Sequence, residues 1–392
     1  MLKRILKRKI KDCLTGSLDN RGEGKVKEQK ELKEPNQSIG SRISINQIIC
    51  ILLILALVYL STGGIWEEKN ALANKHLQEV EETLETDIKS IEMNLQDIDV
   101  EVHLVESDTV EVIEYASNDE DEELVEMKQD AGKVVIQSKE SKHRGFWDWL
   151  KWGNTNKRKI EVNIPNKFKE QLKIVTSSGD IKIEENWTLA GLELFTASGD
   201  IHLGEIKADS EIESASGDIY INALLGKEHQ LKTASGEISL EKGEGNFEIA
   251  SISGDQRLGI IMGKSHEISS TSGSIDIEEI EGTCDMTSVS GAFNVEHLSG
   301  DGKAKLTSGE FCVEELDLQG DLKVETLSGE VELTFTSDSN AAIELKSKSG
   351  GIKGDMPISY AGINKTNGVA EIGNGTSNHV EIETVSGDIY IE

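Results

Sequence analysis

The sequence of 392 residues is poor in the residues on which disulfide-rich domains and most enzymes depend. It contains four cysteines, three prolines and only 4% aromatic residues. The four cysteines are too few for a disulfide framework, and their spacing matches no zinc motif. The sequence also lacks an H-E-x-x-H motif, a G-x-S-x-G motif and a phosphate-binding loop. We therefore expect a protein that is not an enzyme and holds no cofactor.

Basic residues are scarce as well, since 41 Lys and Arg stand against 72 Asp and Glu, for a formal charge of −31. Met1–Trp66 runs against this trend with 12 basic and 6 acidic residues, which leaves −37 on the remainder. Such an asymmetry indicates two parts that face different surroundings. The acidic remainder has no basic stripe, so we expect no nucleic-acid partner. An envelope protein, a glycan and a cationic peptide stay open as partners.

One uncharged run, Ile43–Trp66, has about the length that a helix needs to cross a bilayer. A basic segment precedes it and an acidic one follows, so the positive-inside rule places the N-terminus in the cytoplasm. A cleaved signal peptide would need a shorter basic region and a small-residue cleavage site. We therefore predict a single-pass helix over 43–66 in the cell membrane, with the C-terminal domain outside the cell. The basic cytoplasmic tail, 1–42, lies on an anionic inner leaflet or is simply solvated.

Two segments are predicted between the membrane and the main domain. Residues 67–92 form an amphipathic stalk helix, which packs on the next domain or pairs with a second copy. Its apolar residues recur at steps of three and four: Leu77, Val80, Leu84, Ile88 and Ile91. Residues 93–170 alternate apolar and polar side chains with period two, which predicts a strand-rich cap domain. Its aromatic cluster covers an open sheet end or contacts a membrane interface: Phe146, Trp147, Trp149 and Trp152.

From residue 171 to 392 the sequence repeats a short unit. Each unit has a Ser-Gly corner, an apolar residue five positions before the glycine, and in most units an apolar pair two and four positions after it. Thr or Ser stands three positions before the glycine in all units but one. Successive glycines are 18 to 21 residues apart, except for a last interval of 37: Gly179, Gly199, Gly217, Gly236, Gly254, Gly273, Gly291, Gly309, Gly329, Gly350 and Gly387.

A unit this short cannot bury its own apolar side. Stacking on the next unit completes the core and pairs the backbone groups, which is the principle of a β-solenoid. We therefore predict an all-β fold, a parallel β-helix of about 18–20 residues a coil, and favour right-handed winding. The corner glycines are expected to supply a positive φ. The repeat also places Cys284 inward and Cys312 outward, which argues against a disulfide between them.

The residue after the corner glycine is acidic in five successive units: Asp180, Asp200, Asp218, Glu237 and Asp255. Stacked carboxylates repel one another and can recruit Ca²⁺ or another hard cation. A short acidic residue also suits an exposed turn. We favour this second interpretation, because the nonapeptide calcium-solenoid motif is missing.

The repeats read TSSGDIKI, TASGDIHL, SASGDIYI and TVSGDIYI, with the strand IEVNIP ahead of them. They resemble a bacterial family of β-strand-repeat domains of unknown function, described as a "putative adhesin" family. It includes the membrane-anchored member of the Lia cell-envelope-stress operon of Gram-positive bacteria. The resemblance implies a β-helical exterior domain tied to envelope adhesion or stress response.

The function we expect is that of a non-enzymatic, membrane-anchored, extracytoplasmic interaction module of the bacterial cell envelope, similar to an adhesin. Two alternatives remain. One is a β-helix enzyme that acts on polysaccharides, for which Asp255 and Arg257 are the candidate residues. The other is a structural scaffold, in which solenoids associate end to end.

Overall fold

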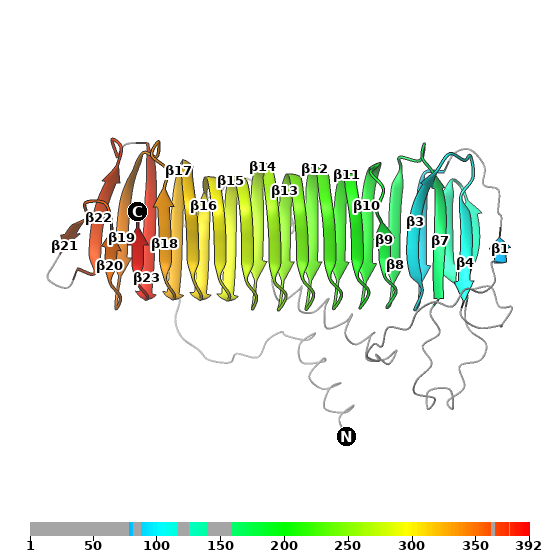
Figure 1. Ribbon diagram of the computed structural model, residues 1–392, viewed down its shortest axis with the longest axis horizontal. Helices are drawn as coiled ribbons and strands as arrows, with labels where there is room; N and C mark the ends of the chain where they lie inside the picture. Colours follow the sequence, from blue (N-terminus) through cyan, green and yellow to red (C-terminus); the bar gives the residue numbers. More distant parts are fainter. Residues whose placement is uncertain (1–77, 81–87, 117–124, 140–157, 362–364, 376) are drawn as a thin grey trace, which may run out of the picture. The chain divides into compact units, whose positions relative to one another are not determined.

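The computed structural model describes residues 78–80, 88–116, 125–139, 158–361, 365–375 and 377–392. Over these residues the chain forms one continuous sheet of 24 strands that winds into a β-solenoid (Figure 1). The predicted all-β, parallel solenoid is confirmed, with about nine turns of about 19 residues each. Its right-handed winding stays a prediction.

The body of the solenoid consists of long strands that pair in parallel and in register with the strands before and after them. From β11 to β17, each strand begins just after one corner glycine and ends just before the next. The body strands are β8 (Gln171–Thr176), β9 (Ile181–Ile183), β10 (Trp187–Thr196), β11 (Ile201–Ser214), β12 (Ile219–Thr233), β13 (Ile238–Ser251), β14 (Gln256–Ser270), β15 (Ile275–Ser290), β16 (Phe293–Ser308), β17 (Phe311–Ser328) and β18 (Val331–Phe335).

In-register stacking lines up equivalent residues of successive coils in columns. The residue five positions before the corner glycine is buried in every coil, from Ile174 to Ile382. The apolar pairs after the glycine, such as Ile201 and Leu203, are buried too. Each such isoleucine or leucine contributes about 1.5–3 kcal/mol through burial. Because every column is completed by the neighbouring coils, this stabilisation depends on the stack.

The N-terminal end continues the same core. β2 pairs in parallel with β8, and β3 pairs in parallel with β9 and β7. Two outer strands, β4 and β5, then close the end by antiparallel pairing with β7 and β6. The strands of this end are β1 (Gln78–Val80), β2 (Ser90–Leu95), β3 (Asp99–Val105), β4 (Glu111–Ala116), β5 (Val125–Asp130), β6 (Lys133–Ser138) and β7 (Arg158–Pro165).

Several predicted features lie outside the described residues: the tail 1–42, the membrane helix 43–66, most of the stalk helix, and the cluster of Phe146, Trp147, Trp149 and Trp152. Within the described part of the chain, no helix is long and apolar enough to cross a membrane. Two described parts of the predicted stalk helix, Gln78–Val80 and Ser90–Glu92, belong to the strands β1 and β2, so the helix prediction is wrong there. Burial alternates along β2, and Ile91 pairs with β8 in the core, which outweighs the helical spacing.

At the C-terminal end, chain order and stacking order differ. The last strands, β23 and β24, pair with β17 and β18 on one side and with β19 and β20 on the other. Figure 1 shows the chain's C-terminus between these elements. β22 and β21 close this end by antiparallel pairing. The strands are β19 (Ala341–Ser347), β20 (Ile352–Gly354), β21 (Ser359–Ala361), β22 (Asn367–Ile372), β23 (Asn378–Ser386) and β24 (Ile389–Ile391).

The corner glycines are required for a reason other than the predicted positive φ. Of the eleven, only Gly309 has a positive φ, at 148°. What excludes a side chain is the adjoining coil, because a Cβ on Gly217 would lie 1.8 Å from the carbonyl oxygen of Gly199. The same contact recurs from corner to corner, at 1.7–2.4 Å. The corners therefore form an axial column in which backbone packs directly on backbone.

Gly217→Ala is expected to lower the free energy of unfolding by about 1–3 kcal/mol or more, because the obstructing atom is backbone and moves only if two coils separate. Gly351→Ala is the matched control, since its added Cβ meets nothing closer than 3.4 Å. Urea unfolding of the two variants measures the difference. Equal midpoints would contradict a packing role for the column.

Candidate functional site

The polar residues of the corner serve the turn itself. In several coils the Gly N–H donates to the hydroxyl three residues earlier, as from Gly199 to Thr196 Oγ1 (2.9 Å) and from Gly217 to Ser214 Oγ (2.8 Å). In others the hydroxyl donates instead to the glycine carbonyl, as from Ser251 to Gly254 (2.8 Å). These hydroxyls are buried, so each local bond satisfies a group that water does not reach.

The acidic row after the glycine also has a structural task. The backbone N–H groups of Asp200, Asp218 and Glu237 donate to Oδ1 of the aspartate one coil back, at 2.9, 2.9 and 2.8 Å. One carboxylate oxygen of each acceptor is thus committed to the neighbouring coil. Burial and the charges of Asp180 and Asp218 raise the pKa of Asp200, although the bond from the Asp218 N–H lowers it. Of the candidates for Ca²⁺ ligands, Asp180, Asp200, Asp218 and Asp255 each accept a backbone N–H of the next coil, and Glu237 pairs with Arg257.

Two substitutions at Asp200 separate the hydrogen bond from the charge. Asp200→Asn keeps an oxygen acceptor and removes repulsion within the row, so we expect unchanged or higher stability in urea. Asp200→Ala leaves the Asp218 N–H without its acceptor and is expected to cost about 1 kcal/mol. A Ca²⁺-dependent rise in melting temperature that disappears in Asp200→Asn would instead show that the row binds calcium.

A second cluster was missed by sequence reasoning. Glu101 and His103 of β3 and Glu161 of β7 offer ligand atoms within 4.8 Å of one another, and in the described part of the chain this is the group with metal-like spacing. His103 Nδ1 lies 3.0 Å from a carboxylate oxygen of Glu185. Lys159 ion-pairs with both Glu101 and Glu161, which lowers the pKa of both carboxyls although burial opposes this. With an ammonium group already between the carboxylates, the arrangement is that of an ion-pair network.

The residues considered for a polysaccharide-cleaving site do not converge. Arg257 ion-pairs with Glu237, a carboxylate of the previous coil. Asp255 accepts a hydrogen bond from the Ser274 N–H at 2.8 Å. Both candidate groups are thus engaged with neighbouring coils, in different directions. The geometry gives the enzyme alternative no support.

Two histidines, His229 and His266, are buried in the core. His229, Phe247 and His266 stack in successive coils, with ring centroids 4.6 and 6.0 Å apart. Each histidine Nε2 donates to a backbone carbonyl, that of Glu244 or Glu281. His229 Nδ1 then accepts from Ser210 Oγ at 2.8 Å. The buried Nδ1 of His266 has no partner, because Phe247 occupies the place one coil back that Ser210 occupies for His229.

Burial lowers the pKa of both His229 and His266. Because the unfolded chain binds protons near pH 6.5 and the folded chain does so only at lower pH, acid favours unfolding. Their contribution to stability is complete above about pH 6.5 and is lost progressively below it. We expect His266→Phe to show a shallower fall in the free energy of unfolding between pH 7 and 5 than the parent chain. Parallel pH profiles from urea titrations would contradict this assignment.

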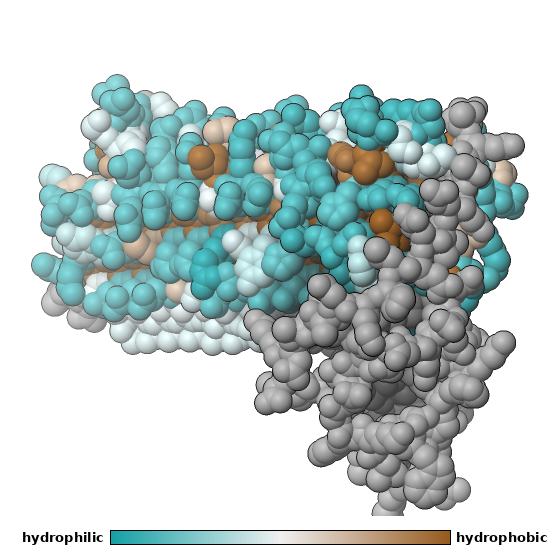
Figure 2. Space-filling model, turned by 45° about the vertical axis from the view of Figure 1, so that its right-hand side comes forward, coloured by the Kyte–Doolittle hydropathy of each residue, from teal (hydrophilic) through white to brown (hydrophobic). Residues whose placement is uncertain are grey.

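The in-register stacking of the coils also determines which side chains lie together on the surface. Figure 2 shows a largely hydrophilic side with a pale band along its lower edge, the edge where the strands of Figure 1 end at the corners. Exposed serines such as Ser290, Ser308 and Ser328 precede the corner glycines there.

An acidic face lies on the other side of the corner, over β15, the first halves of β16 and β17, and β18. Its outward carboxylates belong to segments 274–282, 292–299, 310–319 and 330–335, which contain no Lys or Arg. We define the acidic face by these residues: Asp276, Glu278, Glu296, Glu310, Glu314, Glu330 and Glu332. Half-buried Cys312 lies among them, and burial followed by the nearby charges of Glu332, Glu314 and Glu310 raises its thiol pKa. Buried Cys284 lies in the core, so both cysteines are free, as predicted.

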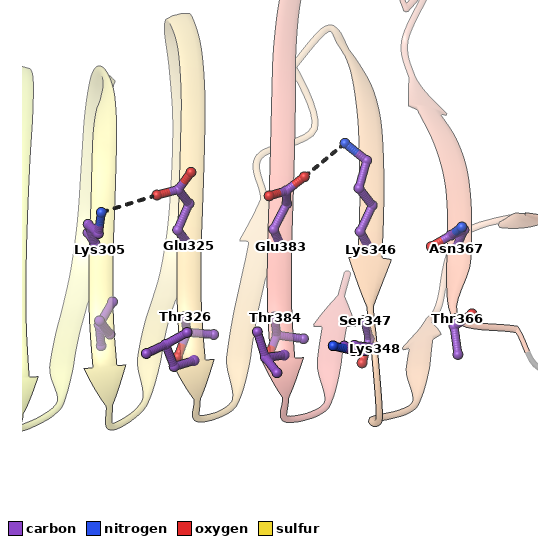
Figure 3. A pocket seen from close by; sticks show the side chains of 13 residues that line it. Lys305, Glu325, Thr326, Lys346, Ser347, Lys348, Thr366, Asn367, Glu383 and Thr384 are labelled. Atoms are coloured by element: carbon purple, nitrogen blue, oxygen red, sulfur yellow. Dashed lines mark hydrogen bonds and ion pairs between the residues drawn. The ribbon is translucent and has the colours of Figure 1, made fainter. Parts of the chain in front are cut away.

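A shallow hollow of about 550 Å³ lies at the C-terminal end, along the corners of β17, β23 and β19. Figure 3 shows Glu383 of β23 between Glu325 and Lys346, with Thr326 and Thr384 at the strand ends. Lys346 pairs with Glu344, Glu381 and Glu383, and its hydrogen bonds to these carboxylates raise the pKa of the Lys346 ammonium above its usual value. The lining is therefore mixed in charge.

A family model described as Toastrack DUF4097 matches residues 88–258 and 245–392. The chain belongs to this family. The Toastrack match begins where the described core begins, at β2, and the family resemblance of the Ser-Gly-Asp repeats is thereby confirmed.

Two solved structures are similar to this Toastrack chain, each at 13% sequence identity and over 81% of its length. One is a "putative cell adhesion protein" from Clostridium sporogenes, covered over 99% of its chain with a TM-score of 0.19. The other is a "putative adhesin" from Bacteroides fragilis, covered over 98% with a TM-score of 0.31. No curated protein matches the sequence. At this identity and these TM-scores, the two structures do not bear on function.

Proposed function

We propose that the protein is a non-enzymatic, membrane-anchored interaction module of the bacterial cell envelope, whose solenoid lies outside the cell and binds a cationic partner through the acidic face. The anchor is the apolar run 43–66, and the charge change across it supports the orientation. A role in adhesion or envelope stress fits this placement.

The observation that carries the proposal is the absence of Lys and Arg from the acidic face. Elsewhere several outward carboxylates form ion pairs within the solenoid, as Glu248 does with Lys232 and Glu344 with Lys346. On the acidic face, equivalent positions of successive coils carry Glu278, Glu296 and Glu314, about one strand spacing apart. A row of like charges at this spacing is unfavourable alone and is relieved by a polycation that spans several coils.

End-to-end stacking as a scaffold is opposed by the caps. The parallel sheet is closed at both ends by antiparallel strands. Of these, β21 has three residues, and β5 ends in exposed Lys128, Gln129 and Asp130. Short, charged edge strands prevent another sheet from pairing.

A lysine dodecapeptide is the probe for the acidic face. We expect the full chain in detergent to bind it, and binding to weaken as NaCl rises. The triple variant Glu296→Gln/Glu314→Gln/Glu332→Gln is expected to bind about tenfold more weakly, since each exposed ion pair contributes roughly 0.2–1 kcal/mol. Calorimetry at two salt concentrations gives both quantities.

The matched control is Glu248→Gln/Glu267→Gln/Glu344→Gln, which removes the same charge from strand segments that precede the corner. We expect it to change the affinity by less than about twofold. Equal losses in the two triple variants would show attraction by net charge alone and would contradict a site on the acidic face.

A further inference from the structure

The C-terminal coil is inserted into the stack out of chain order. The corner of β23 and β24, at Gly387, packs between Gly329 and Gly350: a Cβ on Gly387 would meet the Gly329 carbonyl oxygen at 1.9 Å, and one on Gly350 would meet that of Gly387 at 1.8 Å. The chain thus builds the coil of β17 and β18, passes over one place, builds the coil of β19 and β20, and returns to fill the gap. The 37-residue interval between Gly350 and Gly387 marks this return.

The inserted coil joins the cap to the body. Its inward residues Val380, Ile382 and Ile389 are fully buried. In the described chain, β19 and β20 have strand pairings with β22, β23 and β24 but none with β17 or β18. The contact of the cap sheet with the body therefore passes through residues 378–392.

The coil of β19 and β20 carries what is needed to occupy the same place. Moved one coil toward the body, it would set Ile343 on Leu322 and Leu345 on Val324, as Val380 and Ile382 are set now. Ser347 would follow on Thr326, so the hydroxyl position is also kept.

The charges fit this second arrangement at least as well. At present Glu325 faces Glu383 in register, a like-charge pair. The moved coil would place Lys346 opposite Glu325 and Glu344 opposite Lys323. Lys323, which now lies 3.0 Å from Glu381, would keep a carboxylate neighbour. The body can therefore be closed either by the inserted coil or by the coil of β19 and β20.

The seam around the inserted coil is also the least complete corner of the stack. The buried hydroxyls of Thr326 and Thr384 have no hydrogen-bond partner. Next to them Leu327 and Val385 are 56% and 44% exposed. The hollow of Figure 3 follows this seam. Unpaired buried hydroxyls and exposed apolar side chains both reduce the free energy that is gained when the inserted coil packs between its neighbours.

We propose that residues 378–392 exchange between two copies of this chain, each copy's C-terminal coil filling the place between β17 and β19 of the other. The hinge is the segment that follows β22, where Gly373 and Gly375 both have φ of +64°. Exchange keeps every in-register contact of the inserted coil, and closure by β19 and β20 protects the body while the coil is out. The partner is a second copy because its C-terminal coil has the same register and the same corner as the coil it replaces. The inference is independent of the proposed binding to the acidic face.

Cysteine cross-linking in the full chain tests the exchange. Cys13, Cys50 and Cys312 are replaced by Ser, and two differently tagged copies are expressed together, one with Glu325→Cys and the other with Glu383→Cys. These positions face each other on neighbouring parallel strands, about 4.8 Å apart, within the range that a disulfide spans. We expect an oxidised species of twice the chain mass that carries both tags.

Two controls decide the outcome. A single chain with both Glu325→Cys and Glu383→Cys shows that the pair oxidises, and copies with Glu248→Cys and Glu267→Cys place the same geometry in the middle of the solenoid, where no exchange is possible. Absence of the two-tag species when the single chain oxidises would overturn the proposal. So would equal cross-linking of the mid-solenoid pair, which would indicate random collision.

Discussion

The structure depends on the close approach of backbones at the column of corner glycines. There the carbonyl oxygen of one coil occupies the space in which the next coil would carry a Cβ. The contact fixes how the coils stack, and the strands, the corner hydroxyls and the acidic residues after the glycine all follow its register. The hydroxyl satisfies the turn within a coil, whereas the aspartate carboxylate reaches the next coil's N–H. Where the motif reads Ser-Gly-Asp, as at Gly199 and Gly217, both the glycine and the aspartate therefore contact the neighbouring coil.

Because the register is fixed, the position of a residue in the repeat determines where its side chain lies on the solenoid. Inward places form the core columns, and outward places form long rows in which a single kind of residue accumulates over several coils. The acidic face arises in this way, because consecutive units place carboxylates and no cations after the corner. The same rule lets the core accept His229 and His266, since a buried imidazole can reach the carbonyl of Glu244 or Glu281. The function proposed for this scaffold therefore rests on a row of side chains that extends over several coils.

Because the coils are nearly identical, the core contacts alone do not determine which coil lies next to which. At both ends one coil lies out of chain order between two others: β2 and β3 lie between the coils of β8 and β9 and of β6 and β7, and β23 and β24 lie between β17 and β19. In each case antiparallel strands then close the sheet. These coils separate the first and last body coils from their caps, and each of them is adjacent to its cap in sequence: β3 directly precedes β4, and β23 directly follows β22.

The sequence by itself determined the period, the inward and outward positions and the solenoid class. These features depend on the pattern of side chains within one unit, and that pattern recurs from unit to unit. It placed Cys284 inside and Cys312 outside correctly for this reason. It did not reveal that Gly217 is required by the carbonyl of Gly199, that Gly387 packs on Gly329, or that Glu101, His103 and Glu161 share a surface. Helical spacing also suggested a helix where Ser90 begins a strand. These features depend on which coil lies beside which, and equivalent units compete for the same place. Only the tertiary structure, through its caps and chain connections, decides that order.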